Sequence, residues 1–190
     1  MKEFAVGMMI FGVVLGALLL LSEVNNEKSE IISLPLNVVI VEGEVGSGRS
    51  EENIEKLIGD VNSIWGVANI TFYIKDIRHV GMGTEDVETA MLDGKKFADA
   101  DEYDKGAVNI VFIKNMSHNG VSFTNHKMVV MPDKTTNREY VAAAHELGHV
   151  MGLGHNPDEE FLMYSVCNET EMTFFETLGA RRSARALLSS

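Results

Sequence analysis

The chain has 190 residues, about the length of one domain, and its 45% hydrophobic and 23% charged content is ordinary for a globular protein. This composition excludes a fibrous or wholly disordered chain. The 28 acidic and 16 basic side chains give a net charge of -12, so no nucleic-acid partner is expected, because binding to phosphates needs a basic surface. The single cysteine, Cys167, excludes an intramolecular disulfide and a multi-cysteine zinc site, and we expect it to be a small buried residue.

An apolar run, Phe4–Leu21, stands near the N-terminus and is long enough to cross a bilayer as a helix. Lys2 precedes this run, and Glu23 and Glu27 follow it. The positive-inside rule therefore predicts a cytoplasmic N-terminus, with the rest of the chain on the outer side of the membrane. The run also suits a signal peptide, although no A-x-A-like cleavage site follows it. We therefore expect residues 1–22 to be an N-terminal hydrophobic helix that anchors an extracellular domain in the membrane. The alternative is a cleaved signal segment and secretion.

Residues 23–35 are polar and end at a proline, which predicts a linker before a domain at 36–190. The first half of that domain predicts a strand, a helix with Ser50 as its N-cap, and a second, half-buried strand. These elements cover residues 36–43, 51–65 and 69–76, respectively.

An acidic stretch at 83–106 predicts a solvated helix and loop. Its cluster from Asp99 to Asp104 could hold calcium, although it lacks the central Gly and closing Glu of an EF-hand. A plain acidic surface loop is the other interpretation.

The second half of the domain predicts two more buried strands, an edge strand between them and a long helix. The strands cover residues 107–114, 117–125 and 128–132, and the helical pattern runs from Thr135 to Met151. Strands mixed with helices in this order predict a layered α/β or α+β domain.

The segment that carries chemistry begins at His145 and reads H-E-L-G-H-V-M-G-L-G-H. On a helix, His145 and His149 project from one face and can share a zinc ion. Gly152 can end the helix in a left-handed conformation, and the turn then brings His155 back as a third ligand. Three His ligands leave the fourth position open, which is typical of catalytic zinc rather than structural zinc. The carboxylate of Glu146 can reach a zinc-bound water without binding the metal.

This segment, followed by Met163, resembles the signature of the metzincin clan of zinc peptidases, and the spacing through NPDEEFLMY is most similar to that of matrixins. The resemblance implies a zincin-like fold: a mixed five-stranded sheet with a backing helix, an active-site helix that ends at Gly152, and a C-terminal helix. It also implies that Met163 forms an apolar floor beneath the zinc-binding histidines. Ser165 stands where matrixins usually have a proline. His118 and His126 together could hold a second zinc, although no acid lies between them, and the other interpretation is a pair of surface or edge-strand histidines.

The motif and the resemblance together predict a zinc metalloendopeptidase in which Glu146 is the general base. An extended peptide or protein substrate is expected to pair with the exposed edge at Asn119–Asn125. The alternative from another class is a zincin-fold binding module that holds metal but cleaves nothing. A pure binder has no need for Glu146, which argues against that alternative.

Overall fold

The computed structural model describes residues 30–166 and 168–189. The Phe4–Leu21 run and Cys167 lie outside the described residues. Among the described residues, no helix is both long enough and apolar enough to cross a membrane. The chain divides after Ile31 into two units, and the fold described below is that of the second unit, Ile32–Ser190.

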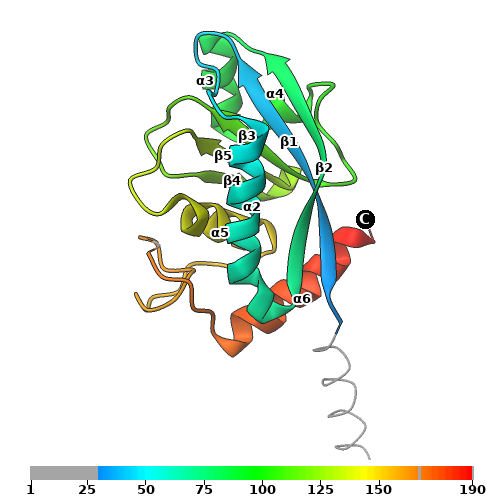
Figure 1. Ribbon diagram of the computed structural model, residues 1–190, viewed down its shortest axis with the longest axis vertical. Helices are drawn as coiled ribbons and strands as arrows, with labels where there is room; N and C mark the ends of the chain where they lie inside the picture. The colour runs from blue at the N-terminus through cyan, green and yellow to red at the C-terminus, as the bar shows by residue number, and fades with distance from the viewer. Residues whose placement is uncertain (1–29, 167, 190) are drawn as a thin grey trace, which may run out of the picture. The chain divides into compact units, whose positions relative to one another are not determined.

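A five-stranded mixed sheet forms the centre of this unit, in the order β2-β1-β3-β5-β4 (Figure 1). Four strands are parallel, and β4 alone runs antiparallel, to β5, at one edge of the sheet. The mixed five-stranded sheet and the edge position of β4 are therefore confirmed. The strands are β1 Ile32–Glu42, β2 Ile70–Gly81, β3 Val108–Ile113, β4 Val121–Phe123 and β5 Met128–Pro132.

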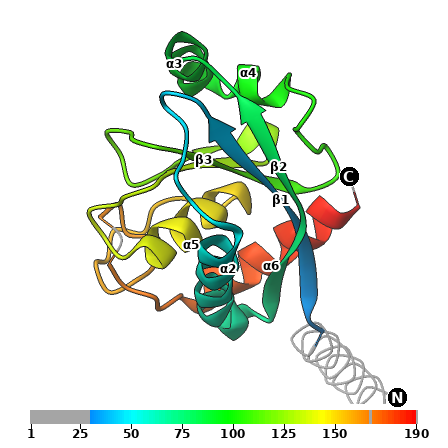
Figure 2. The same ribbon diagram turned by 45° about the horizontal axis from the view of Figure 1, so that its top comes forward.

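Within residues 30–166 and 168–189, five helices accompany the sheet (Figure 2). They are α2 Glu51–Trp65, α3 Thr84–Asp93, α4 Lys95–Ala98, α5 Glu139–Val150 and α6 Phe174–Leu188, with short 3-10 turns at Gly66–Ala68 and Thr124–His126. The predicted N-cap is confirmed, because the Ser50 hydroxyl accepts a hydrogen bond from the Asn53 backbone N–H at 3.3 Å. A capping box between Thr173 and Glu176 starts α6.

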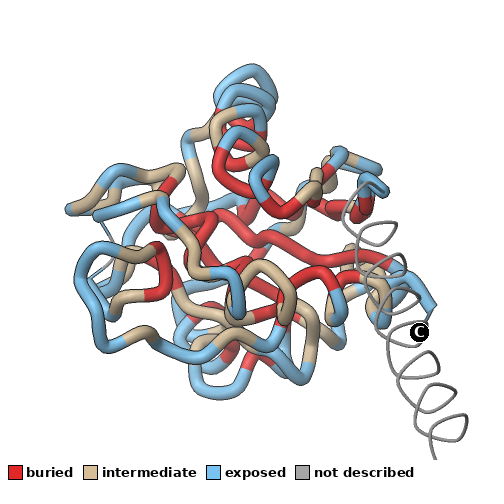
Figure 3. The backbone as a smooth tube through the Cα atoms, turned by 90° about the horizontal axis from the view of Figure 1, so that it is seen from below, coloured by how far each residue is buried: buried red, intermediate tan, exposed pale blue. Residues whose placement is uncertain are grey.

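The central strands are buried on both faces, as expected where helices cover a largely parallel sheet. On β1, Leu36, Val38 and Ile40 join the core formed with α2, α5 and α6. Val39 and Val41 point to the opposite face and join the second core, with α3 and α4. Figure 3 shows these buried strands running through the interior beneath exposed loops. The period of two therefore holds even along 38–41, where four consecutive residues of the strand are apolar.

Two strands are longer than the sequence predicts. β1 begins at Ile32, so the end of the predicted linker 23–35 belongs to the sheet. Pro35 fits within β1 because the pairing with β3 begins only at Leu36, which leaves one side of the strand free where the missing N–H can lie. β2 continues to Gly81 because it pairs with β1 along its whole length.

Arg49 fixes the start of α5 to the sheet. Its guanidinium donates to the backbone carbonyls of Pro132 at 2.8 Å and Asp133 at 3.1 Å, and it forms an ion pair with Glu139. The guanidinium also lies 4.6 Å from the centre of the Phe112 ring. Because this side chain is only 7% exposed, the pairing with Glu139 is shielded from solvent and holds the first turn of α5 in place.

Candidate active site

Helix α5 packs closely against the sheet and against α2 through small and branched residues. Ala142, Ala143 and Ala144 are all buried, and their small side chains let the helix backbone approach its neighbours. This packing fixes the direction in which the next turns of the helix project. His145 is buried and His149 is half-buried, one turn further along the same face.

A left-handed turn ends α5 where the sequence predicts it. Gly152 has φ of 77°, its N–H donates to the His149 carbonyl at 2.8 Å, and the Leu153 N–H donates to the Gly148 carbonyl at 3.0 Å. These two bonds are those of a Schellman motif, which satisfies the last carbonyls of a helix. The chain reverses after this turn, so His155 returns to the two histidines of the helix.

The three imidazoles converge on one point. Nε2 of His149 lies 3.0 Å from Nε2 of His145 and 3.2 Å from Nε2 of His155. Nδ1 of His145 lies 2.8 Å from the Leu162 carbonyl, and Nδ1 of His149 lies 2.8 Å from the Leu153 carbonyl. A carbonyl can only accept, so in each ring Nδ1 carries the proton and Nε2 presents its lone pair to the shared point.

This arrangement fits a zinc ion. Three nitrogen ligands at 2.0–2.1 Å from a tetrahedral zinc lie roughly 3.3 Å apart, close to the spacing of these Nε2 atoms. Without a cation, the unprotonated Nε2 atoms of His145 and His149 would face one another with no proton between them. His145, His149 and His155 are the one group of three potential ligands of this kind among residues 30–166 and 168–189.

Burial shifts the protonation of two residues on α5. It lowers the pKa of His145 from 6.5 to about 4, and the neighbouring His149 and His155 add to this effect, so that His145 is neutral and able to ligate at pH 7. Burial also raises the pKa of Glu146, against a hydrogen bond from the Ser122 hydroxyl that lowers it. A carboxylate with a raised pKa is a stronger base than one in free solution.

Met163 packs directly against α5. It is fully buried, and a Cβ added at Gly148 would come within 2.5 Å of its sulfur. The Asn156 N–H donates to the Met163 carbonyl at 2.7 Å, which closes the segment between His155 and this turn. The absence of a side chain at Gly148 is therefore what lets Met163 lie directly against α5.

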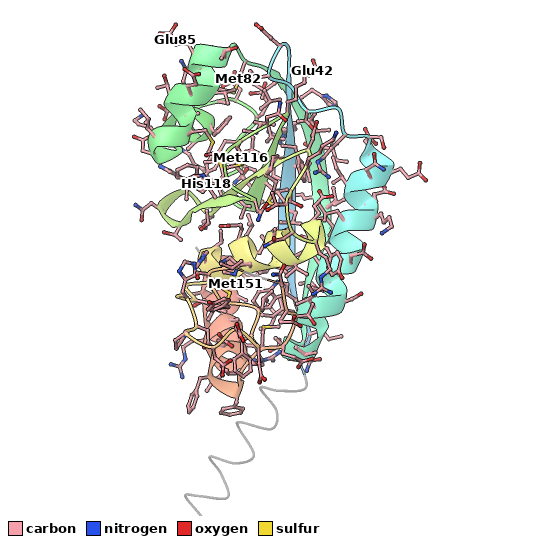
Figure 4. The ribbon with its side chains drawn as sticks, turned by 90° about the vertical axis from the view of Figure 1, so that its left-hand side faces the viewer. Glu42, Met82, Glu85, Met116, His118 and Met151 are labelled. Atoms are coloured by element: carbon pink, nitrogen blue, oxygen red, sulfur yellow. The ribbon has the colours of Figure 1, made fainter. Side chains whose placement is uncertain are left out.

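A cleft of about 570 Å³ contains the three histidines and Glu146. The segment before β4 forms one wall, and Met116 and His118, labelled in Figure 4, belong to that segment. Ser165 and Val166, after the turn at Met163, also line the cleft. Gly120 and Ser122 contact Glu146 from the β4 side, and sequence reasoning singled out neither residue, because no motif marks them.

The other candidate metal sites do not gather ligands. His118 and His126 belong to no group of three potential ligands within the described part of the chain. In the acidic stretch, Asp99 pairs with Lys95, and Asp104 pairs with Lys75 at 2.5 Å. Calcium in this stretch stays a prediction.

Comparison with known proteins agrees with this geometry. The sequence profile of the Matrixin family matches residues 91–178, a range that includes α5 and the turn at Met163. Over this range the chain is similar to the matrixins of the metzincin clan. Zinc is the metal that this family and the histidine triad support. No curated protein sequence matches the chain.

Solved structures share the fold of this matrixin-like chain at low sequence identity. Metalloproteinase-II from Bacteroides fragilis is 17% identical with a TM-score of 0.55, covering 80% of this chain, and the chain spans 53% of that protein. A chain of a chaperone–substrate complex is 12% identical with a TM-score of 0.54, covering 83% of this chain and 35% of that one. A zinc-dependent peptidase from Methanocorpusculum labreanum is 12% identical with a TM-score of 0.46, covering 76% and 99%. The first two show a common fold.

The turn predicts different consequences for Gly152→Ala and His155→Ala. The first forces a left-handed φ on a residue with a Cβ and should lower the free energy of unfolding by about 1–2 kcal/mol while zinc still binds. The second removes a ligand and should weaken zinc binding far more. Chemical denaturation and competition with a chelator measure the two effects. Equal and negligible effects would show that the chain does not turn at this point.

The pKa of His145 predicts that metal-free protein loses stability in acid. The pKa of His145 is 6.5 in the unfolded chain and about 4 in the folded protein. At pH values between the two, the unfolded state therefore binds a proton at His145 that the folded state does not bind. The free energy of unfolding should therefore fall as pH falls through this window, by up to about 3 kcal/mol.

His145→Gln should flatten this pH dependence, since its amide can donate to Leu162 without titrating. His79→Gln, at an exposed histidine on β2, is the matched control for the change from histidine to glutamine. An unchanged slope in His145→Gln would contradict the assignment.

Proposed function

We propose that this chain is a zinc metalloendopeptidase that hydrolyses peptide bonds in extended polypeptides. The observation that carries the proposal is the convergence of three Nε2 atoms in the cleft that also holds Glu146. Two turns of α5 and the reversal at Gly152 supply all four side chains. The family supports a peptide or protein substrate, and the cleft offers space for one.

His145, His149 and His155 would hold zinc through Nε2. When bound, zinc acidifies a water molecule and polarises a peptide carbonyl. Glu146 accepts the proton of the attacking water and returns it to the leaving nitrogen of the substrate. Burial of Glu146 suits both transfers, because a raised pKa makes the carboxylate a better base and stabilises its protonated form relative to that of a free glutamate.

The edge of the sheet gives the substrate a place to bind. β4 pairs with β5 on one side only, so the backbone groups on its other side are free to pair with an added strand. Gly120, just before β4, and Ser122, within it, line the same cleft as the histidines. A peptide added along Asn119–Asn125 would therefore bring its backbone past the proposed zinc site.

The membrane-anchored, extracellular location is also part of this proposal, and it rests on the Phe4–Leu21 sequence alone. Full-length protein is expected to stay with membranes after an alkaline wash, with the peptidase domain open to protease from outside. A mature protein that begins near residues 22–26 and accumulates in the medium would instead establish a cleaved signal segment.

Glu146→Ala separates a peptidase from a binding module. The substitution removes the proposed base but none of the three metal ligands, so zinc content should stay the same while peptide cleavage falls by about 10²–10⁴-fold or more. Leu147→Ala is the control, because this fully buried neighbour on α5 should act on stability rather than on the chemical step.

Two results would oppose the proposal. A Glu146→Ala protein that cleaves peptides at the wild-type rate would remove Glu146 from the mechanism. Wild-type protein that holds zinc and binds a partner but cleaves no peptide would establish the binding module instead.

A further inference from the structure

The side chain of Glu146 is confined from the β4 side of the cleft. A Cβ built on Gly120 would lie 2.7 Å from Cγ and 3.3 Å from Cδ of Glu146, and 2.9 Å from the sulfur of Met131. Real Cβ atoms essentially never come within 3.0 Å of other atoms, and Met131 is fully buried in a close-packed core, so its sulfur has little space to move into. Gly120 is therefore the residue that leaves room for the Glu146 side chain.

A second residue of the same segment faces the end of that side chain. Ser122 lines the cleft together with Glu146, and its hydroxyl lowers the pKa of the Glu146 carboxyl, as a donor beside the carboxylate does. Ser122 is fixed in place by β4, whose pairing puts it opposite Val129 of β5. The two contacts thus act on different parts of one side chain, Gly120 on its stem and Ser122 on its carboxylate.

We propose that the segment Gly120–Ser122 positions the general base: Gly120 sets the path of the Glu146 stem, and Ser122 sets the direction of its carboxylate. This inference rests on the proposed peptidase function. A glutamate has three rotatable side-chain bonds, so α5 alone does not determine where the carboxylate points. A hydrogen bond to a charged group is strong enough to select one orientation.

The placement has a consequence for the reaction. The strand that holds the carboxylate is also the edge strand that a peptide substrate would pair with. The same short strand would therefore position both the substrate backbone and the general base. Such mutual alignment matters because a small misplacement of a catalytic group lowers the rate steeply. Ser122 and Gly120 are positioning residues, since they act through Glu146.

The test compares Ser122→Ala with Ser122→Thr in the full-length, zinc-loaded protein. Ser122→Ala should lower kcat about 10-fold or more with KM and zinc content unchanged, whereas Ser122→Thr, which keeps the hydroxyl, should retain most of the activity. Ser33→Ala, at an exposed strand serine on β1, is the matched control. An unchanged kcat in Ser122→Ala would overturn the proposal.

Gly120→Ala gives an independent reading. The added Cβ must displace Glu146, so kcat should fall on the order of 10²-fold while zinc content and the melting temperature show that the site and the fold persist. Near wild-type kcat in a folded Gly120→Ala protein would contradict the role assigned to Gly120.

A double-mutant cycle tests whether Ser122 acts through Glu146. In a Glu146→Ala background, Ser122→Ala should have no further effect on the residual rate. An equal loss in both backgrounds would mean that Ser122 acts elsewhere and would overturn the inference. If the zinc-loaded wild-type protein cleaves no peptide, the proposed function fails. If Glu146→Ala lowers the rate and Ser122→Ala does not, only this inference fails.

Discussion

Two backbone carbonyls, those of Leu153 and Leu162, determine what the site can do. Each accepts a hydrogen bond from Nδ1 of a histidine on α5 and so turns the lone pair of Nε2 toward the cleft. Both carbonyls belong to the chain that follows the helix. The metal-binding geometry therefore depends on the reversal at Gly152 and on the turn at Met163, and not on the helix alone.

Contacts elsewhere in the fold hold α5 and these two turns in position. Gly148 lets Met163 pack directly beneath α5, and Arg49 fixes the start of the helix to the end of β5. Buried alanines between these points bring α5 close to its neighbours. A helix fixed at its start, along its length and at its end cannot rotate, which is what preorganised catalytic side chains need. The side chain of Glu146 extends from α5 into the cleft that the β4 segment borders.

Local patterns predicted the parts of the molecule that local physics controls. The cap at Ser50, the buried strand at 107–114 and the left-handed turn at Gly152 follow from residue type and spacing. The start of β1 and the length of β2 did not, because pairing between the two strands overrides a proline and a run of charged residues. The contacts of Gly120 and Ser122 with Glu146 join segments far apart in sequence, so no motif could show them. The N-terminal anchor stays a prediction from sequence.

The proposed chemistry requires three imidazoles to bind one zinc ion in this cleft. X-ray absorption spectroscopy of the chain loaded with one equivalent of zinc measures that coordination. We expect three imidazole nitrogens at about 2.0–2.1 Å and one further oxygen. Two results would contradict this coordination. One is a thiolate sulfur ligand at about 2.3 Å, which would have to come from Cys167, the single cysteine, and the other is a shell made mainly of carboxylate oxygens.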